Sequence, residues 1–155
     1  MSKEKKIVGM IFALSVLINV LIHFEPKTAM VDAASSSQSD IQLMARAING
    51  EARGEPYEGQ VAIGAVILNR VKHASFPNTI AGVIYQSGAF TAVADGQINQ
   101  PIASGSTVVK AARDAMNGWD PSGGAIYYFN PKTATSKWIW SRKQIKTIGQ
   151  HIFCK

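Results

Sequence analysis

One segment of this 155-residue sequence limits its fold more than any other, the apolar stretch from Gly59 to Val71. Its apolar residues, Val61–Ile63 and Ala65–Leu68, fall on nearly every side of a helix instead of along one stripe. A helix that is apolar all round is covered on all sides in a folded protein, so we predict that it is central and buried. Gly64 lies inside this stretch and would let a neighbouring backbone come close.

An amphipathic helix is predicted just before this central one. Asp40 is a favourable N-cap residue, and apolar residues follow it at helical spacing, namely Ile41, Met44, Ala45, Ile48 and Ala52. Gly50 and Gly54 indicate where this helix loosens and ends. Pro56 can then occupy the first turn of the central helix.

Two further helices are expected, at Thr79–Gln86 and from Thr107 to Asn117, where Gly118 would stop the second one. Between them, residues 87–106 contain glycine and proline and show little periodicity. A segment of that length without regular structure is more often a functional loop than a plain connection.

A small sheet is predicted near the C-terminus. Ala125–Phe129 and Ile145–Phe153 have the residue types and partial alternation of strands, and Trp138–Trp140 is a candidate third strand. Because helices come first and strands last, the predicted fold class is α+β, mainly helical with a small antiparallel sheet.

The N-terminal segment has the pattern of an export signal. A lysine-rich start, residues 1–6, precedes an apolar run from Ile7 to Ile22 that is shorter than the roughly 20 residues of a membrane-spanning helix. We therefore expect residues 1–33 to be a signal peptide or an N-terminal membrane anchor, residues 34–39 a short flexible linker, and residues 40–155 one exported domain.

The charge balance favours an anionic partner. The chain has 16 Lys and Arg against 10 Asp and Glu, a net charge of +6. An exported domain without a nucleic-acid-binding motif is not expected to bind nucleic acid, whereas an anionic polymer of the cell wall fits both charge and compartment. The only cysteine, Cys154, excludes an internal disulfide and a multi-cysteine zinc site.

The candidate catalytic group is a carboxyl group. The three histidines stand apart, and no metal-binding, phosphate-binding or serine-hydrolase motif is present, so we expect no metal and no cofactor. Glu51 falls on the apolar face of the amphipathic helix, where burial would favour the protonated form that a general acid needs. A structural ion pair with Arg46 or Arg53 would explain the same position. Glu55 and Glu58 are expected to be ordinary charges near a helix start.

Aromatic residues provide a second clue. Polar side chains such as Asn130 alternate with a cluster made of Tyr127, Tyr128, Phe129, Trp138 and Trp140. Flat rings with hydroxyl and amide groups nearby suit a sugar, which offers C–H faces and ring hydroxyls. The same aromatic residues could instead form the core of the small sheet.

Ordered blocks of the sequence resemble one enzyme family. These blocks are Ala45–Gln60, Ala65–Arg70, Phe90–Ile98, Ala111–Ala115, Asp120–Ala125 and Tyr128–Trp138. Together they are similar to the cell wall hydrolase family of SleB and CwlJ, the spore cortex-lytic enzymes. The resemblance extends over about Ile41 to Lys155, which is all of the predicted exported domain.

The resemblance implies a lysozyme-like α+β fold related to lytic transglycosylases, and peptidoglycan glycan strands as the substrate. It also assigns the catalytic glutamate of the family to Glu51. SleB-type enzymes usually carry an N-terminal peptidoglycan-binding domain, whereas here the predicted signal leads directly into the catalytic domain. Action on the spore cortex during germination and remodelling of the vegetative wall therefore both stay open.

The resulting prediction is a lytic transglycosylase that cleaves after N-acetylmuramic acid, with Glu51 as its single catalytic carboxyl group. Asp95 is the only other acid in the loop expected to face the cleft. The sugar is expected to be held by Thr91, Gln97, Tyr127, Tyr128 and Asn130. The alternatives are an N-acetylmuramoyl-L-alanine amidase, which would commonly need zinc, and a wall-binding module without catalytic activity.

Overall fold

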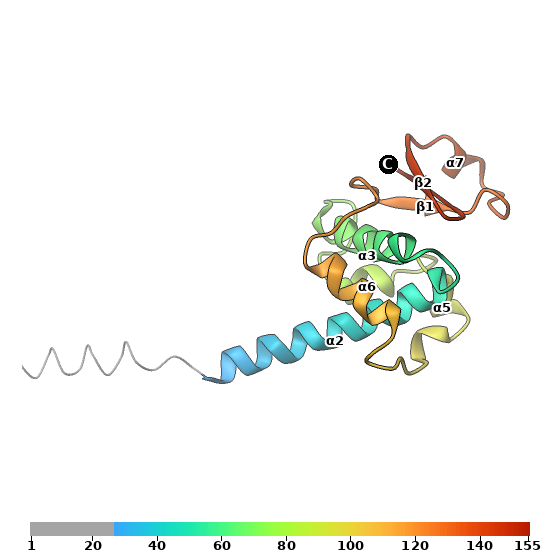
Figure 1. The fold of residues 1–155 in the computed structure, drawn as a ribbon. Helices are drawn as coiled ribbons and strands as arrows, with labels where there is room; N and C mark the ends of the chain where they lie inside the picture. Colours follow the sequence, from blue (N-terminus) through green and yellow to red (C-terminus); the bar gives the residue numbers. More distant parts are fainter. Residues whose placement is uncertain (1–26) are drawn as a thin grey trace, which may run out of the picture. The chain divides into compact units, whose positions relative to one another are not determined.

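Residues 27–155 are described by a computed structural model, and within them residues 37–155 form one compact unit (Figure 1). The expected export signal or anchor lies mostly outside the described residues and stays a prediction. Among the helices of residues 27–155, none is long and apolar enough to cross a membrane.

Helix α2 runs from Lys27 to Ala52 and so begins well before Asp40, its predicted start. Residues 34–39, expected to be a flexible linker, are helical instead. They contain neither glycine nor proline, and alanine and glutamine are favourable in helices, so nothing ends the helix there. The predicted apolar face is confirmed, because all of its members are buried: Ile41, Met44, Ala45, Ile48 and Ala52.

Helix α3 (Tyr57–Lys72) is the central helix that the apolar stretch predicted, and most of its residues are buried. A Cβ on Gly64 would lie 2.9 Å from the Cβ of Ala115 and 3.3 Å from the Cδ1 of Ile48. This glycine therefore allows α2 and the later helix α6 (Thr107–Met116) to pack closely against α3. In Figure 1 the small sheet lies on the side of α3 that faces away from α2.

The short helix α4 (Ile80–Ile84) confirms the prediction for residues 79–86. The Oγ1 of Thr79 accepts a hydrogen bond from the N–H of Gly82 at 3.0 Å, which caps the helix. The prediction of a helix beginning near Thr107 is confirmed by α6, whose apolar residues are buried against the rest of the core.

Residues 87–106, expected to lack regular structure, contain two single-turn helices, α5 (Thr91–Ala94) and η1 (Gln97–Asn99). Ala92 and Ile98 are buried and attach these turns to the core. Helices of one turn are too short for hydrophobic periodicity to reveal, and contacts with the rest of the domain decide whether they form.

The sheet has three antiparallel strands, β1 (Tyr127–Phe129), β2 (Gln144–Ile148) and β3 (His151–Cys154), in the order β1-β3-β2. The prediction of one strand over residues 145–153 is wrong, because the chain turns back at Gly149, whose φ is +57°. Glycine adopts this left-handed conformation without steric cost. The predicted class, α+β and mainly helical with a small antiparallel sheet, is confirmed.

Trp138–Trp140 is not a strand but part of helix α7 (Lys137–Trp140). The ring of Trp138 packs edge-on against Tyr127 with centroids 5.0 Å apart, and that of Trp140 packs against Phe129 at 4.8 Å. These packing contacts outweigh the β-propensity of the aromatic residues, which was the basis of the prediction.

Candidate active site

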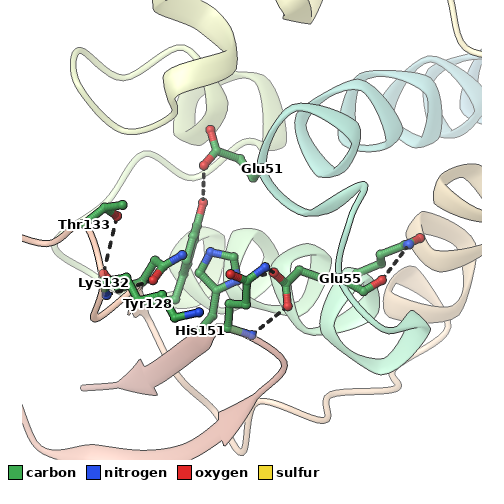
Figure 2. A network of polar contacts seen from close by, with 9 residues as sticks. Glu51, Glu55, Tyr128, Lys132, Thr133 and His151 are labelled. Atoms are coloured by element: carbon green, nitrogen blue, oxygen red, sulfur yellow. Dashed lines mark hydrogen bonds and ion pairs between the residues drawn. The ribbon is translucent and has the colours of Figure 1, made fainter.

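Glu51 lies in the last turn of α2, where segments distant in the sequence meet around its carboxylate. The backbone N–H of Ala92, in α5, donates a hydrogen bond to Oε1 at 3.2 Å. The hydroxyl of Tyr128, in β1, donates to Oε2 at 3.1 Å (Figure 2). The residue is partly buried, and the two hydrogen bonds hold its carboxyl group in place.

The approach of α5 to Glu51 depends on the residue just before it. A Cβ on Gly50 would collide with the Cβ of Ala92, which is itself fully buried. The glycine therefore lets α5 rest directly on the end of α2, and this contact brings the N–H of Ala92 within reach of Glu51.

Tyr128 joins the carboxylate to the sheet. Burial raises the pKa of Tyr128 well above its ordinary value, and the nearby charge of Glu51 adds to this shift. The phenol therefore stays protonated at neutral pH and acts as a hydrogen-bond donor. Its ring packs edge-on against His151, with centroids 5.3 Å apart, and lies 6.1 Å from the ring of Phe153.

Glu55 is not the ordinary surface charge that was expected, because only 6% of its side chain is exposed. Its carboxylate accepts hydrogen bonds from the backbone N–H of Gln150 at 2.8 Å and from the Nε2 of the same residue at 3.3 Å. The Nδ1 of His151 lies 3.7 Å away. Glu55 thus fastens the β2–β3 turn to the start of α3 and supports the ring that packs against Tyr128 (Figure 2).

His151 is shielded from solvent at this junction. Burial lowers its pKa below the ordinary value, although Glu55 and Glu51 partly offset the shift. The imidazole is therefore neutral at neutral pH. Glu58, by contrast, is the expected surface charge, since its half-exposed carboxylate lies 3.7 Å from the Nζ of Lys146.

Arg70 is a buried charge that the sequence analysis did not single out. Only 7% of the residue is exposed, and its Nε donates to the carbonyl oxygen of Ile126 at 2.7 Å. Its guanidinium lies over the rings of Phe76, Phe90 and Tyr127, 5.3–5.8 Å from their centroids. Its spacing from Ile67, three residues earlier on the apolar helix, was the signal that could have revealed its burial.

A groove of about 310 Å³ opens between β1, α7 and the start of the loop that leads to α5. Residues 86–89 line it, together with Arg70, Phe76, Tyr127, Tyr128, Trp138 and Ile139. Tyr128 lines this groove and also donates to Glu51, which is not itself among the lining residues, so one residue connects the groove with the carboxyl group. Trp138 is half exposed there, so its ring is available to a ligand.

The strand that supplies Tyr128 is fixed to α3 by the turn before it. The Nδ2 of Asn69 donates to the Oδ2 of Asp120 and to the carbonyl oxygen of Ala125, each at 3.0 Å. The Oδ1 of Asp120 accepts from the N–H and the hydroxyl of Ser122. Burial alone would raise the pKa of Asp120, but these hydrogen bonds and one from a backbone N–H hold it below its ordinary value.

The other predicted sugar-binding residues lie at different places around Glu51. Thr91 is exposed and begins α5, next to Ala92. The Nε2 of Gln97 donates to the Oδ2 of Asp95 at 2.7 Å, so both side chains are paired within their loop. Asn130 follows β1, and its Oδ1 accepts from the N–H of Lys132 at 2.9 Å, which stabilises a turn. The structure joins Tyr128 to Glu51 directly, places Tyr127 in the groove, and shows Asn130 bonded within its own turn.

Within the described part of the chain, no three His, Cys, Asp or Glu side chains are grouped so that they could hold a metal ion. Cys154 is buried in β3 and unpaired. A carboxyl group such as that of Glu51 is a type of group that can act as a general acid or base.

Comparison with known proteins gives close relatives. The chain is 69% identical over 119 residues to a spore cortex-lytic enzyme of Bacillus cereus. The aligned segment covers 77% of this chain and 45% of the relative. It is 65% identical over 120 residues to the spore cortex-lytic enzyme of Bacillus subtilis, covering 38% of that protein. The chain thus spans less than half the length of these relatives. The cell wall hydrolase CwlJ of Bacillus subtilis is 34% identical over 125 residues, which cover 86% of it.

Solved structures agree with the fold. The crystal structure of the catalytic domain of the Bacillus cereus SleB protein is 69% identical, with a TM-score of 0.72, and the match covers 76% of this chain and 91% of that one. The catalytic domain of the germination-specific lytic transglycosylase SleB from Bacillus anthracis is 68% identical, with a TM-score of 0.73 and 95% of it covered. The family model described as Cell Wall Hydrolase matches residues 54–154. The resemblance read from the sequence is confirmed, and this chain belongs to the cell wall hydrolase family.

Proposed function

We propose that this chain cleaves the glycan strands of peptidoglycan as a lytic transglycosylase, with Glu51 as its catalytic acid. The observation that carries the proposal is the position of the Glu51 carboxyl group, which is held by Ala92 and by Tyr128, a residue that also lines a groove with other aromatic rings. A 68% identical relative with the same fold is named a lytic transglycosylase.

In the first step, protonated Glu51 donates its proton to the glycosidic oxygen that follows N-acetylmuramic acid. The bond between C1 of that sugar and the oxygen breaks, and the leaving sugar departs with the proton as a free hydroxyl. Positive charge develops at C1 and the ring oxygen, as in other glycoside cleavages. General acid catalysis of this kind typically contributes about 10²–10⁴-fold to the rate.

In the second step, the Glu51 carboxylate removes the proton from the C6 hydroxyl of the same muramic acid. The C6 oxygen bonds to C1 and closes a 1,6-anhydro ring, so Glu51 is protonated again and no water is consumed. Between the two steps the N–H of Ala92 and the hydroxyl of Tyr128 donate to the carboxylate and stabilise its charge.

One carboxyl group suffices for this sequence of steps, whereas ordinary glycosidases use two. The neighbouring acids have other roles in the structure. Asp95 accepts hydrogen bonds from the side chain and backbone of Gln97. Glu55 is buried and bonded to Gln150, with His151 beside it.

The glycan would lie along the groove, with sugar rings against Tyr127 and the half-exposed Trp138. Thr91 and Gln97 would contact the sugar from the loop that carries α5, and Asn130 from the end of β1. These assignments rest on the proximity of both segments to Glu51 and on the hydrogen-bonding groups that they carry.

Export of the catalytic domain follows from the substrate, which lies outside the cytoplasm. Residues 1–33 would direct it there as a cleaved signal or as an anchor, with residues 40–155 acting on cortex or wall. An alkaline phosphatase fusion at Gln38 would then be active. An inactive fusion that is fully expressed would contradict export.

Mass spectrometry of the muropeptides released from purified peptidoglycan tests the chemistry. We expect products that end in 1,6-anhydro-N-acetylmuramic acid, lighter by one water than reducing ends. Glu51→Gln keeps the size of the side chain but cannot donate a proton, so release should fall to the assay background. Glu58→Gln, at a half-exposed carboxylate, is the matched control and should release normally.

Asp95→Asn distinguishes a mechanism with one catalytic carboxyl group from a mechanism with two. Because the proposed reaction needs no second carboxylate, this variant should keep substantial activity and the same anhydro products. Reducing ends throughout, together with an inactive Asp95→Asn, would indicate a hydrolase with two carboxyl groups. Normal release by Glu51→Gln would refute the assignment of the acid.

A further inference from the structure

Trp140 is a large apolar side chain that lies outside the groove. The residue is 44% exposed, and it is not among the residues that line the groove. An aromatic ring of this size stabilises a folded protein mainly by being buried, so a half-open one on the surface is informative. Trp138, two residues earlier in α7, is also half exposed but lines the groove.

The ring of Trp140 is held in place although it is exposed. Its Nε1 donates a hydrogen bond to the carbonyl oxygen of Ala134 at 3.2 Å. The ring also packs against the buried Phe129, with centroids 4.8 Å apart and planes at 66°. A hydrogen bond from the ring edge and one such contact cover at most one face of the indole. The other face is open, and the held ring loses little freedom when a ligand stacks on it.

The two tryptophans of α7 point to different sides of this helical turn. Residues two apart in a helix are separated by about 200° around its axis and do not face each other. Trp138 lines the groove, so Trp140 presents its ring elsewhere. In Figure 1, α7 lies on the far side of the strands from α3. A sugar on Trp140 and a sugar in the groove would therefore be separate contacts.

The segment that carries α7 is strongly basic. Residues 121–155 contain no Asp or Glu, so that apart from the terminal carboxylate their charges are six cations: Lys132, Lys137, Arg142, Lys143, Lys146 and Lys155. The excess of positive charge in the whole chain, +6, is thus concentrated in its last part. The guanidinium of Arg142 lies over the ring of Trp138, 4.7 Å from its centroid, which brings positive charge directly to α7.

Carboxylates from the rest of the domain contact this segment, but not at α7. They reach the strands and the turns beside them, and they belong to Glu51, Glu55, Glu58 and Asp120. Among the described residues, no hydrogen bond or ion pair joins a side-chain carboxylate to residues 131–143. The surface around α7 therefore attracts negative charge from outside the protein.

An open aromatic face on a basic surface indicates a carbohydrate polymer that carries negative charge. A sugar ring has a C–H face that stacks on an indole, and the negative charge would lie near the cations of α7. Peptidoglycan meets both requirements. Its lactyl carboxyl groups are used in amide bonds to the peptide stems, but the stems themselves carry free carboxylates.

We propose that Trp140 and the cations around α7 form a second peptidoglycan-binding site, outside the groove, in which a sugar ring stacks on Trp140. The inference rests on the proposed function for the identity of the polymer, and not for the chemistry of Glu51. Such a site keeps the enzyme on an insoluble substrate while the groove releases one product and takes up the next bond.

Binding to the insoluble polymer tests the role of the tryptophan. The full-length chain carries Glu51→Gln to prevent cleavage, and its sedimentation with peptidoglycan stripped of teichoic acid gives a Kd. Adding Trp140→Ala should weaken binding about tenfold, as expected for the loss of one stacked aromatic ring. Trp119→Ala is the matched control, because Trp119 is 45% exposed and packs against Tyr57 in another part of the domain. Equal binding of the two variants would overturn the proposal.

A neutral polymer tests the role of the cations. Chitin has N-acetylglucosamine rings but no peptide stems, so at low salt it should bind more weakly than peptidoglycan. The difference should shrink as salt screens the charges. Equal binding of chitin and peptidoglycan at low salt would refute the role of the cations. Retention only by walls that keep their teichoic acid would overturn the proposal, because the surface would then recognise a polyphosphate.

The indole N–H resonances decide the matter if Trp140→Ala does not fold. The chain has three tryptophans, and Trp119→Phe and Trp138→Phe identify the signals of two, which leaves the third to Trp140. The ligand is a soluble tetrasaccharide of alternating N-acetylglucosamine and N-acetylmuramic acid with its peptide stems, added to the Glu51→Gln chain. We expect the signals of Trp138 and Trp140 to shift and that of Trp119 to stay.

A shift at Trp138 alone would overturn the proposal, since the groove would then be the only site that takes the glycan. Failure of the proposed function has a different signature. Cleavage of the tetrasaccharide by the Glu51→Gln chain, or reducing ends released by the unaltered enzyme, would refute the mechanism. Neither result would alter the comparison of Trp140→Ala with Trp119→Ala.

Discussion

Tyr128→Phe tests whether the hydroxyl that reaches Glu51 from the sheet contributes to catalysis. The substitution removes the donor at 3.1 Å from Oε2 and keeps the ring against His151 and Phe153. A hydrogen bond to a charged group contributes about 1.5–3 kcal/mol. If that stabilisation is realised when Glu51 is a carboxylate between the two steps, the rate should fall roughly ten- to hundredfold.

Stability should change much less than the rate. Glu51 is only partly buried, so water can replace the lost donor, and the free energy of unfolding should change by less than about 1 kcal/mol. The assay is the initial rate of muropeptide release together with urea denaturation. Tyr85→Phe, at an exposed tyrosine, is the matched control. A normal rate for Tyr128→Phe would refute the reasoning, as would a rate loss explained by unfolding.

Two further predictions concern the supports of the site. The pKa of Asp120 is held below its ordinary value of about 3.9, so its ionised carboxylate stabilises the folded state. This stabilisation is fully present at a pH above the ordinary pKa, and it is lost as the pH falls through the lower pKa of the folded protein. Thermal midpoints of Asp120→Asn should therefore fall less steeply than the wild type below about pH 4, and parallel curves would contradict this. Gly149→Ala would force a Cβ into Glu55 at a positive φ, and should destabilise by about 1–3 kcal/mol in urea. Gly88→Ala, at φ +71° with open space around it, should cost distinctly less, and equal losses would contradict the clash.

The helices that form the core could be predicted because their hydrophobic patterns extend over several turns. Helix α3 is apolar over several turns, and the buried face of α2 repeats through five apolar residues. The short elements could not be predicted in the same way. Helix α7 and the β2–β3 hairpin contain too few residues for a period to appear, and Gly149 looked like one position in a strand until its φ was known.

The residues of the candidate site also divide into those that could be predicted from the sequence and those that could not. Glu51 and Tyr128, which the structure joins by a hydrogen bond, could be chosen as candidates from residue type, helical face and aromatic content. Glu55 could not, since a glutamate beside proline at a helix start has the pattern of a surface charge, and only the fold of β2 and β3 covers it. Arg70 could not be identified because a basic residue near a helix end is ordinary in sequence, while here this one residue is buried and donates to the carbonyl oxygen of Ile126, just before β1.

The position of Glu51 explains why the domain needs its small sheet. The end of a helix disfavours negative charge because the backbone carbonyls point outward there. Within α2 nothing offsets this unfavourable effect on the carboxylate. The two hydrogen bonds that offset it are donated by residues 41 and 77 positions away in the sequence. The first hydrogen bond depends on the loop that carries α5, which can approach α2 because Gly50 has no side chain. The second depends on strand β1, which Asp120 and Asn69 fix to α3. In the proposed mechanism Glu51 gives up a proton and then takes one back, and the hydrogen bonds from the sheet and the loop would stabilise its charged form, which the end of the helix disfavours.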